Sequence, residues 1–271
     1  MLINYVMDIP FTKAHGTGND FIILYSEDVL SIDDINEDLI QLLCNRRTGI
    51  GADGLLLLSP DKTLDFKMDY YNNDGSWETM CANGARCAVL YMYHRGLIKN
   101  KTAFYAGDGP HDAEVVNDNN IRLKMKSPEY KTNSIKVEGF EGCHVDSGAR
   151  HFAVPVDNLS EINVYKSGRK IRYSNEFSPK GINVNFYTEL GPNSIHVKTY
   201  EKGIEQMMLS CGSGSVAAAY HASQTLGIQN SIDVTVPGGE LNIEFDTNWE
   251  DVWLTGLAIL LFTSTIHLDN L

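Results

Sequence analysis

Residues 80–91 read Met-Cys-Ala-Asn-Gly-Ala-Arg-Cys-Ala-Val-Leu-Tyr, and residues 210–220 read Ser-Cys-Gly-Ser-Gly-Ser-Val-Ala-Ala-Ala-Tyr. In each stretch a cysteine and a glycine-containing turn precede a run of small and apolar residues, which is typical of a buried helix. Cys81 and Cys211 lie 130 residues apart in a chain of 271 residues, which is close to half of its length. This spacing predicts a duplicated domain that brings two thiols to one site.

The composition indicates a soluble globular protein with ample core, since 43% of the residues are hydrophobic and 21% are charged. The net charge of −13 argues against a nucleic-acid partner, because phosphate binding needs a clustered basic surface. Five cysteines without a secretory signal favour a reducing cytoplasm over a disulfide framework. The apolar run at 256–262 is too short to span a membrane and is predicted to be a buried strand. No cysteine or histidine spacing indicates a metal site.

The hydrophobic pattern predicts strands and helices in a similar order in both halves of the chain. Strands are expected at 21–25, 54–58, 66–71, 182–186, 194–200, 233–236, 241–245 and 252–262, and helices at 35–44, from Cys81 to about His94, and after Cys211. Residues 102–157 are expected to be rich in short strands. The expected fold class is α+β, with two pseudo-symmetric domains, each a mostly antiparallel β-sheet or barrel wrapped around a central helix. The first domain would span 1–126, with 257–271 returning to it, and the second 127–256.

The two cysteine motifs suit chemistry at an acidic carbon. Removal of an α-proton from an amino acid needs a positioned base, and inversion without a cofactor needs an acid on the opposite face. A helix N-terminus favours a thiolate through its partial positive charge. Its N–H groups, from Ala82 and Asn83 and from Gly212 and Ser213, are expected to hold the substrate carboxylate. The alternative is that both cysteines are small buried residues, which is the expectation for Cys44, Cys87 and Cys143.

Further motifs extend along the chain, and with them the sequence resembles the diaminopimelate epimerases. The matching segments keep the family's order and lie at 15–21, 48–53, 72–76, 81–87, 148–151, 183, 200–203 and 211–214. The resemblance implies a cofactor-independent enzyme that interconverts L,L- and meso-diaminopimelate, on the route to lysine and peptidoglycan precursors. It also implies a cytoplasmic homodimer, with an amino acid as substrate and no membrane partner.

The resemblance assigns roles to particular residues. Cys81 and Cys211 would be the base and the acid, and His151 and Glu201 would tune and orient the thiols. The remaining expected substrate contacts, in addition to the four helix-start residues, are Asn19, Gly54, Asn72, Asn183 and Lys202. The turn at 49–54 that ends in Gly54 is structural by default.

Several departures from the family pattern concern the substrate. Gly148-Ala149-Arg150-His151 replaces Gly-Asn/Ser-Pro-His, and Lys202 replaces an arginine, whose planar bidentate grip on a carboxylate a lysine lacks. Ala82 replaces a glycine, and Met207-Met208 replaces Glu-Thr. Three hypotheses therefore stand: a diaminopimelate epimerase, an epimerase of the same fold for another amino acid, and an idle relative that only binds an amino acid.

Overall fold

The structure is a computed structural model that describes residues 8–29 and 35–267. The chain divides into two compact units, unit 1 with residues 1–121 and 258–271, and unit 2 with residues 122–257. The divisions fall inside β8 (Asn120–Met125) and inside the long strand β18 (Val252–His267), so each of these strands contributes to both units. The sequence instead predicted the first division between residues 126 and 127, after β8 has ended.

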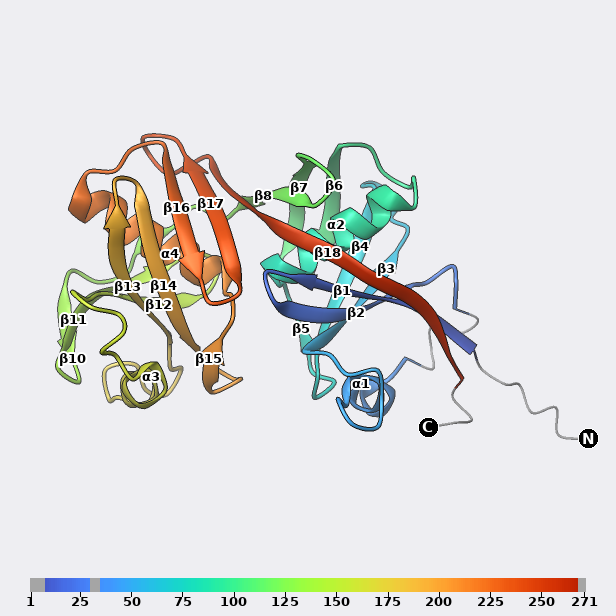
Figure 1. Ribbon diagram of the computed structural model, residues 1–271, viewed down its shortest axis with the longest axis horizontal. Coiled ribbons are helices and arrows are strands. Elements are labelled where there is room, and N and C mark those ends of the chain that lie inside the picture. The colour runs from blue at the N-terminus through green and yellow to red at the C-terminus, as the bar shows by residue number, and fades with distance from the viewer. Residues whose placement is uncertain (1–7, 30–34, 268–271) are drawn as a thin grey trace, which may run out of the picture. The chain divides into compact units, whose positions relative to one another are not determined.

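Unit 1 is a mostly antiparallel ring of strands around a helix (Figure 1). Its elements are β1 (Asp8–Gly16), β2 (Asn19–Tyr25), α1 (Glu37–Cys44), β3 (Gly54–Ser59), β4 (Phe66–Asn72), β5 (Trp77–Glu78), α2 (Ala82–His94), β6 (Lys101–Ala106) and β7 (Gly109–Val115), with the ends of β8 and β18. Neighbouring strands are antiparallel except for the parallel pairs β2–β3 and β4–β6. Strand β18, drawn in red, pairs with β1 and β8 and completes the ring.

Unit 2 repeats this order of elements. They are β9 (Glu129–Tyr130), β10 (Ile135–Val137), β11 (Phe140–Asp146), β12 (Arg150–Pro155), α3 (Val164–Arg172), β13 (Asn183–Gly191), β14 (Ser194–Glu201), β15 (Gln206–Met208), α4 (Gly212–Leu226), β16 (Ser231–Val236) and β17 (Gly239–Phe245). The parallel pairs are β12–β13 and β14–β16, and the others are antiparallel. The succession from β11 to β18 thus matches β1 to β8, and the fold is the predicted α+β duplication.

Strands β2 and β3 of unit 1 and the first half of β13 in unit 2 are buried on both faces, which explains their apolar sequences. Other strands, such as β6 and β16, alternate between buried and more exposed residues. In unit 1, Ile22 and Leu24 pack with Ile40 and Leu43 of α1, whereas Phe21 lies against Gly84 of α2. In unit 2 the same alternation separates a cluster on α3 from a cluster on α4. Because successive side chains of a strand point to opposite faces, one sheet holds an outer helix on one side and the central helix on the other.

Four features differ from the sequence predictions. Strand β1 and helix α3 were not predicted, and the helix predicted at 35–44 begins at Glu37, where Asn36 accepts a hydrogen bond from Leu39 N. The apolar run at 256–262 does form a strand, but Leu261 and Phe262 are about half exposed, at 51% and 52%. Residues 261–265 of β18 are all exposed, although Phe262 packs edge-on against Phe11.

Candidate active site

Each predicted catalytic cysteine occupies the N-cap of the central helix of its own unit. Cys81 precedes α2 with φ −135° and ψ 114°, and Cys211 precedes α4 with φ −136° and ψ 109°. In neither case does the cysteine side chain cap the helix, and both residues are partly exposed. The two caps therefore share one backbone geometry, in which a thiol lies at the positive end of a helix dipole.

Both helices owe their position to small residues. Residues 83–92 of α2 are buried on every side, and α4 begins with glycines and serines before Val216 and a run of alanines. A Cβ on Gly214 would lie 2.2 Å from Asn185 Nδ2 and 3.2 Å from Cys211 Sγ. The glycine is therefore required for the close approach of α4 to β13 beside the thiol.

In unit 1, Cys81 lies in a network of amides. The thiol is 3.8 Å from Asn19 Oδ1, which also accepts a hydrogen bond of 3.2 Å from Asn83 Nδ2. Asn19 Nδ2 in turn donates to Asp53 Oδ2 at 2.8 Å, which fixes the orientation of the amide. Asn19 thus offers the thiol of Cys81 a hydrogen-bond acceptor.

A buried arginine lies one turn along α2 from Cys81. Arg86 is 0% exposed and donates to three neutral oxygens, Thr17 Oγ1, Asn83 Oδ1 and Ala82 O. Among the described residues no carboxylate pairs with it, and its Nε has no hydrogen-bond partner. Burial lowers the pKa of Arg86 to about 10, so the group stays charged at neutral pH. A nearby cation favours a thiolate, and the other neighbouring thiol, Cys87, stays protonated because burial raises its pKa to about 12.

In unit 2, a chain of hydrogen bonds leads from Cys211 into the protein. Cys211 Sγ is 3.8 Å from Ser213 Oγ, which is 2.9 Å from His151 Nε2. His151 Nδ1 is 2.9 Å from Asn185 Oδ1, and Asn185 Nδ2 donates to Thr199 Oγ1 at 2.7 Å. Of the two predicted residues, Ser213 lies next to the thiol of Cys211, and His151 is linked to that thiol through the Ser213 hydroxyl.

His151 is a neutral imidazole. It is 0% exposed, and burial lowers its pKa to about 4, against the smaller opposing effect of the hydrogen bond to Asn185. Because Asn185 offers its carbonyl oxygen, the ring proton resides on Nδ1, and Nε2 is an acceptor directed at Ser213.

This burial makes stability depend on pH. The unfolded histidine binds a proton below pH ~6.5 and the native one only near pH 4, so the unfolded state is favoured as the pH falls through this window. We expect His151 to remove on the order of 2 kcal/mol of unfolding free energy between pH 7.5 and pH 5. Urea unfolding at both pH values measures this, and His151→Gln should flatten the dependence. The variant retains His144, His196 and His221, whose pKa values burial also lowers. If its unfolding free energy depends on pH as strongly as that of the parent, the effect belongs to those histidines and the assignment to His151 is wrong.

The strand registers show that the two units support their thiols differently. In unit 1, Leu56 and its strand partner Tyr70 occupy the positions that Asn185 and its partner Thr199 occupy in unit 2. By the same registers, Phe21 occupies the position of His151. In the central helices, Val216 corresponds to Arg86, because each of them lies five residues after the cysteine of its unit. Unit 1 thus has a buried cation on the helix, and unit 2 has a neutral polar chain from the sheet.

The other predicted contacts of unit 2 gather where β13 begins and β14 ends. Asn183 Nδ2 donates to Arg150 O at 3.1 Å, and Asn183 Oδ1 accepts from Lys202 N at 2.8 Å. Glu201 is the last residue of β14, directly before Lys202. The amide of Asn183 therefore fixes the backbone of Arg150 and Lys202, two residues at which the sequence departs from the family pattern.

In unit 1, Gly54 and Asn72 face each other across β3 and β4. A Cβ on Gly54 would lie 2.5 Å from Tyr71 O, so close packing by itself accounts for this glycine. Asn72 accepts from Tyr70 OH and donates to Ser76 Oγ, within its own hairpin. These hydrogen bonds of Asn72 stay within the hairpin, and the predicted contact of Gly54 and Asn72 with substrate stays a prediction.

Sequence reasoning did not single out four residues that the structure ties to the thiols: Thr17, Asp53, Arg86 and Asn185. Two of them carried a signal. Arg86 is the one charged residue among the small and apolar residues 84–92, and Asn185 lies two positions after Asn183, on the same face of its strand. The others depend on contacts that only the fold creates.

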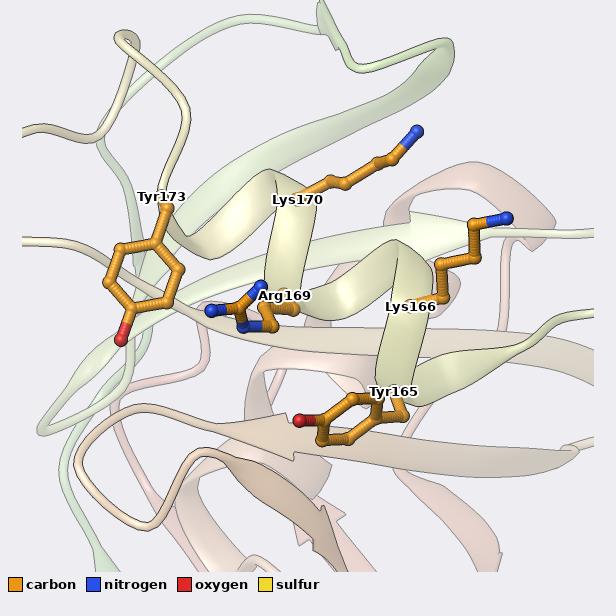
Figure 2. A pocket seen from close by; sticks show the side chains of 5 residues that line it. All are labelled: Tyr165, Lys166, Arg169, Lys170 and Tyr173. Atoms are coloured by element: carbon orange, nitrogen blue, oxygen red, sulfur yellow. The ribbon is translucent and has the colours of Figure 1, made fainter.

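A surface hollow of unit 2 lies elsewhere, on α3 (Figure 2). It is lined by Tyr165, Lys166, Arg169, Lys170 and Tyr173, and the figure shows these side chains spread along one helix. The Arg169 guanidinium lies 5.6 Å from the ring centre of Tyr173. The hollow contains none of the predicted site residues. No helix in the described part of the chain is long and apolar enough to cross a membrane.

Comparison with known proteins identifies the family. The sequence profile of diaminopimelate epimerase matches residues 11–131 and 143–260. The chain belongs to the diaminopimelate epimerase family. It is 41% identical to the diaminopimelate epimerase of Flavobacterium psychrophilum, over 94% of this chain and 98% of that protein. It is 38% identical to the enzyme of Aquifex aeolicus, over 94% and 96% of the two chains.

Solved structures of lower sequence identity share the fold. A hydroxyproline epimerase from Agrobacterium vitis, solved with bound trans-4-hydroxy-L-proline, matches with a TM-score of 0.72 at 14% identity, over 98% of this chain and 94% of that chain. An epimerase predicted in Pseudomonas aeruginosa matches with a TM-score of 0.71 at 11% identity, over 95% and 99%. At these identities the likeness concerns the fold alone.

Proposed function

We propose that this protein interconverts L,L- and meso-diaminopimelate by proton transfer at the α-carbon, with Cys81 and Cys211 as the two proton-carrying groups and without a cofactor. Family membership supports an isomerase that acts as an amino-acid epimerase. The observation that carries the mechanism is the matched pair of cysteine N-caps, with φ and ψ equal within 5° on the central helices of the two halves.

The proposed step balances without a further reactant. One thiolate takes the α-proton, so an S–H bond forms while the Cα–H bond breaks and the electron pair remains on the carbon. The other thiol gives its proton to the opposite face and becomes a thiolate. N–H groups of the first turns of α2 and α4, at Ala82 and Asn83 and at Gly212 and Ser213, would hold the substrate carboxylate and offset the charge that develops beside it.

The distal amino-carboxylate end of diaminopimelate would contact Asn19, Asn72, Asn183 and Lys202, with Gly54 beside them, while Glu201 and His151 act on the thiols. The hydrogen bonds of Asn183 favour an indirect role for this residue. Both amide atoms of Asn183 are engaged by the backbone of Arg150 and Lys202, so Asn183 supports those two residues.

A second candidate is an epimerase of this fold for another amino acid. It is favoured by Ala149, Arg150 and Lys202, which lie together at this end of unit 2 and differ from the family pattern. An idle binding protein has less support, because it needs neither two thiols at helix starts nor a buried histidine linked to one of them.

Proton exchange in deuterium oxide tests these alternatives. Reduced protein is mixed separately with L,L-diaminopimelate, meso-diaminopimelate and a panel of L-amino acids, and α-deuterium is followed by NMR. We expect rapid wash-in with diaminopimelate alone, accompanied by formation of the other isomer. Exchange confined to another amino acid would establish the second candidate, and no exchange with any compound would overturn the enzyme assignment.

The remaining proposals concern the setting of the enzyme. We propose a cytoplasmic homodimer that serves lysine and peptidoglycan precursor synthesis. The five free cysteines support the location, since free thiols persist in a reducing compartment.

A further inference from the structure

The side chain of Ser213 lies between Cys211 and His151. Its Oγ is 3.8 Å from Cys211 Sγ and 2.9 Å from His151 Nε2. The role assigned to Ser213 by sequence uses only its backbone N–H, so the hydroxyl has no assigned function. Its position is well defined, because Ser147 Oγ donates to Ser213 O at 2.7 Å and holds this turn of the chain.

The direction of the hydrogen bonds follows from the far end of the chain. Asn185 Nδ2 donates to Thr199 Oγ1, so Asn185 presents its carbonyl oxygen to His151. His151 must then carry its proton on Nδ1 and accept at Nε2. Ser213 O–H is the donor to Nε2, which leaves a lone pair of Ser213 Oγ to accept from the thiol of Cys211.

We propose that Ser213 is a proton relay between Cys211 and His151, an inference that rests on the proposed two-thiol function. The S–H proton of Cys211 passes to Ser213 Oγ while the Ser213 proton passes to His151 Nε2. The products are a thiolate and an imidazolium whose Nδ1–H is held by Asn185, and the reverse transfer restores the thiol. The electron count is unchanged, and no other reactant takes part.

The relay explains why the imidazole is buried. A neutral His151 can accept a proton at Nε2, and the chain provides a route by which the proton of Cys211 leaves and returns. In unit 1, Phe21, Leu56 and Tyr70 occupy the positions that correspond to His151, Asn185 and Thr199, so no imidazole stands in the place of His151. The relay therefore distinguishes Cys211 from Cys81.

The test is alkylation of the reduced protein by iodoacetamide as a function of pH, with both cysteines followed separately by peptide mass mapping. In Ser213→Ala we expect Cys211 to react about tenfold more slowly near neutral pH, with Cys81 unchanged, and kcat to fall about tenfold. Ser213→Thr restores a hydroxyl and should recover both. Adding Ser213→Ala to His151→Gln should cause no further loss, because the two changes break the same chain.

Ser215→Ala is the matched control. Its hydroxyl lies on the same helix and bonds to the carbonyl of Cys211 at 2.9 Å rather than to the thiol. Equal slowing of Cys211 alkylation in this variant, or none in Ser213→Ala, would overturn the relay. Because alkylation needs no substrate, a protein that fails to exchange diaminopimelate but shows Ser213-dependent alkylation would contradict the proposed function and keep the relay.

Discussion

Cys81→Ser and Cys211→Ser should each lower kcat by about 10³-fold or more while the protein stays folded. A serine hydroxyl fits the space of a thiol but ionises at far higher pH, so neither its base form nor its acidity suits exchange with an α-carbon. Both cysteines are partly exposed N-caps that do not cap their helices, so we expect unfolding free energies within about 1 kcal/mol of the parent. Initial rates in both directions, under reducing conditions, measure the loss.

Cys143→Ala provides the contrast. Cys143 is buried on β11 within the core cluster around α4, and burial raises the pKa of its thiol. Its removal should cost on the order of 1 kcal/mol of stability and leave kcat within a few-fold of the parent. Full activity in either the Cys81 or the Cys211 variant would exclude the two-thiol mechanism.

His151→Gln should have the second largest effect, with kcat reduced by about 10²-fold and KM changed much less. The variant loses the imidazole nitrogen that accepts from Ser213. The glutamine side chain in its place takes up no proton, so a proton from Cys211 can no longer be passed through Ser213 to residue 151. A substrate contact, in contrast, would alter KM first. Steady-state kinetics with each isomer separate the two roles.

His144→Gln is the control for this prediction. His144 is a partly buried imidazole on the neighbouring strand β11, and burial lowers its pKa as well, but none of its described contacts leads to Cys211. It should retain kcat within a few-fold. A loss in His144→Gln as large as in His151→Gln would show that the effect comes from damage to the sheet, and would remove His151 from the mechanism.

The helix α3 shows where local patterns fail. Gly168 lies in the middle of this helix because a Cβ there would approach Tyr200 Cβ to 2.4 Å, and four of its nine residues, Lys166, Arg169, Lys170 and Arg172, are basic. Glycine lowers helix propensity, and the apolar positions Val164 and Ile171 are too few to give a clear period. Packing against β13 and β14 makes this segment helical, and that packing joins residues distant in sequence.

The sequence by itself determined the two cysteine N-caps, the central helices that follow them and the duplicated α+β order, because these depend on residues close together in the chain. Tertiary structure alone decided how each thiol is supported. His151 reaches Ser213 across 62 positions, and Arg86 reaches Thr17 across 69. Such partners have no local signature, since strand register and helix burial bring them together. Two similar motifs thus acquired different surroundings, a buried cation at Cys81 and a neutral hydrogen-bonded chain at Cys211.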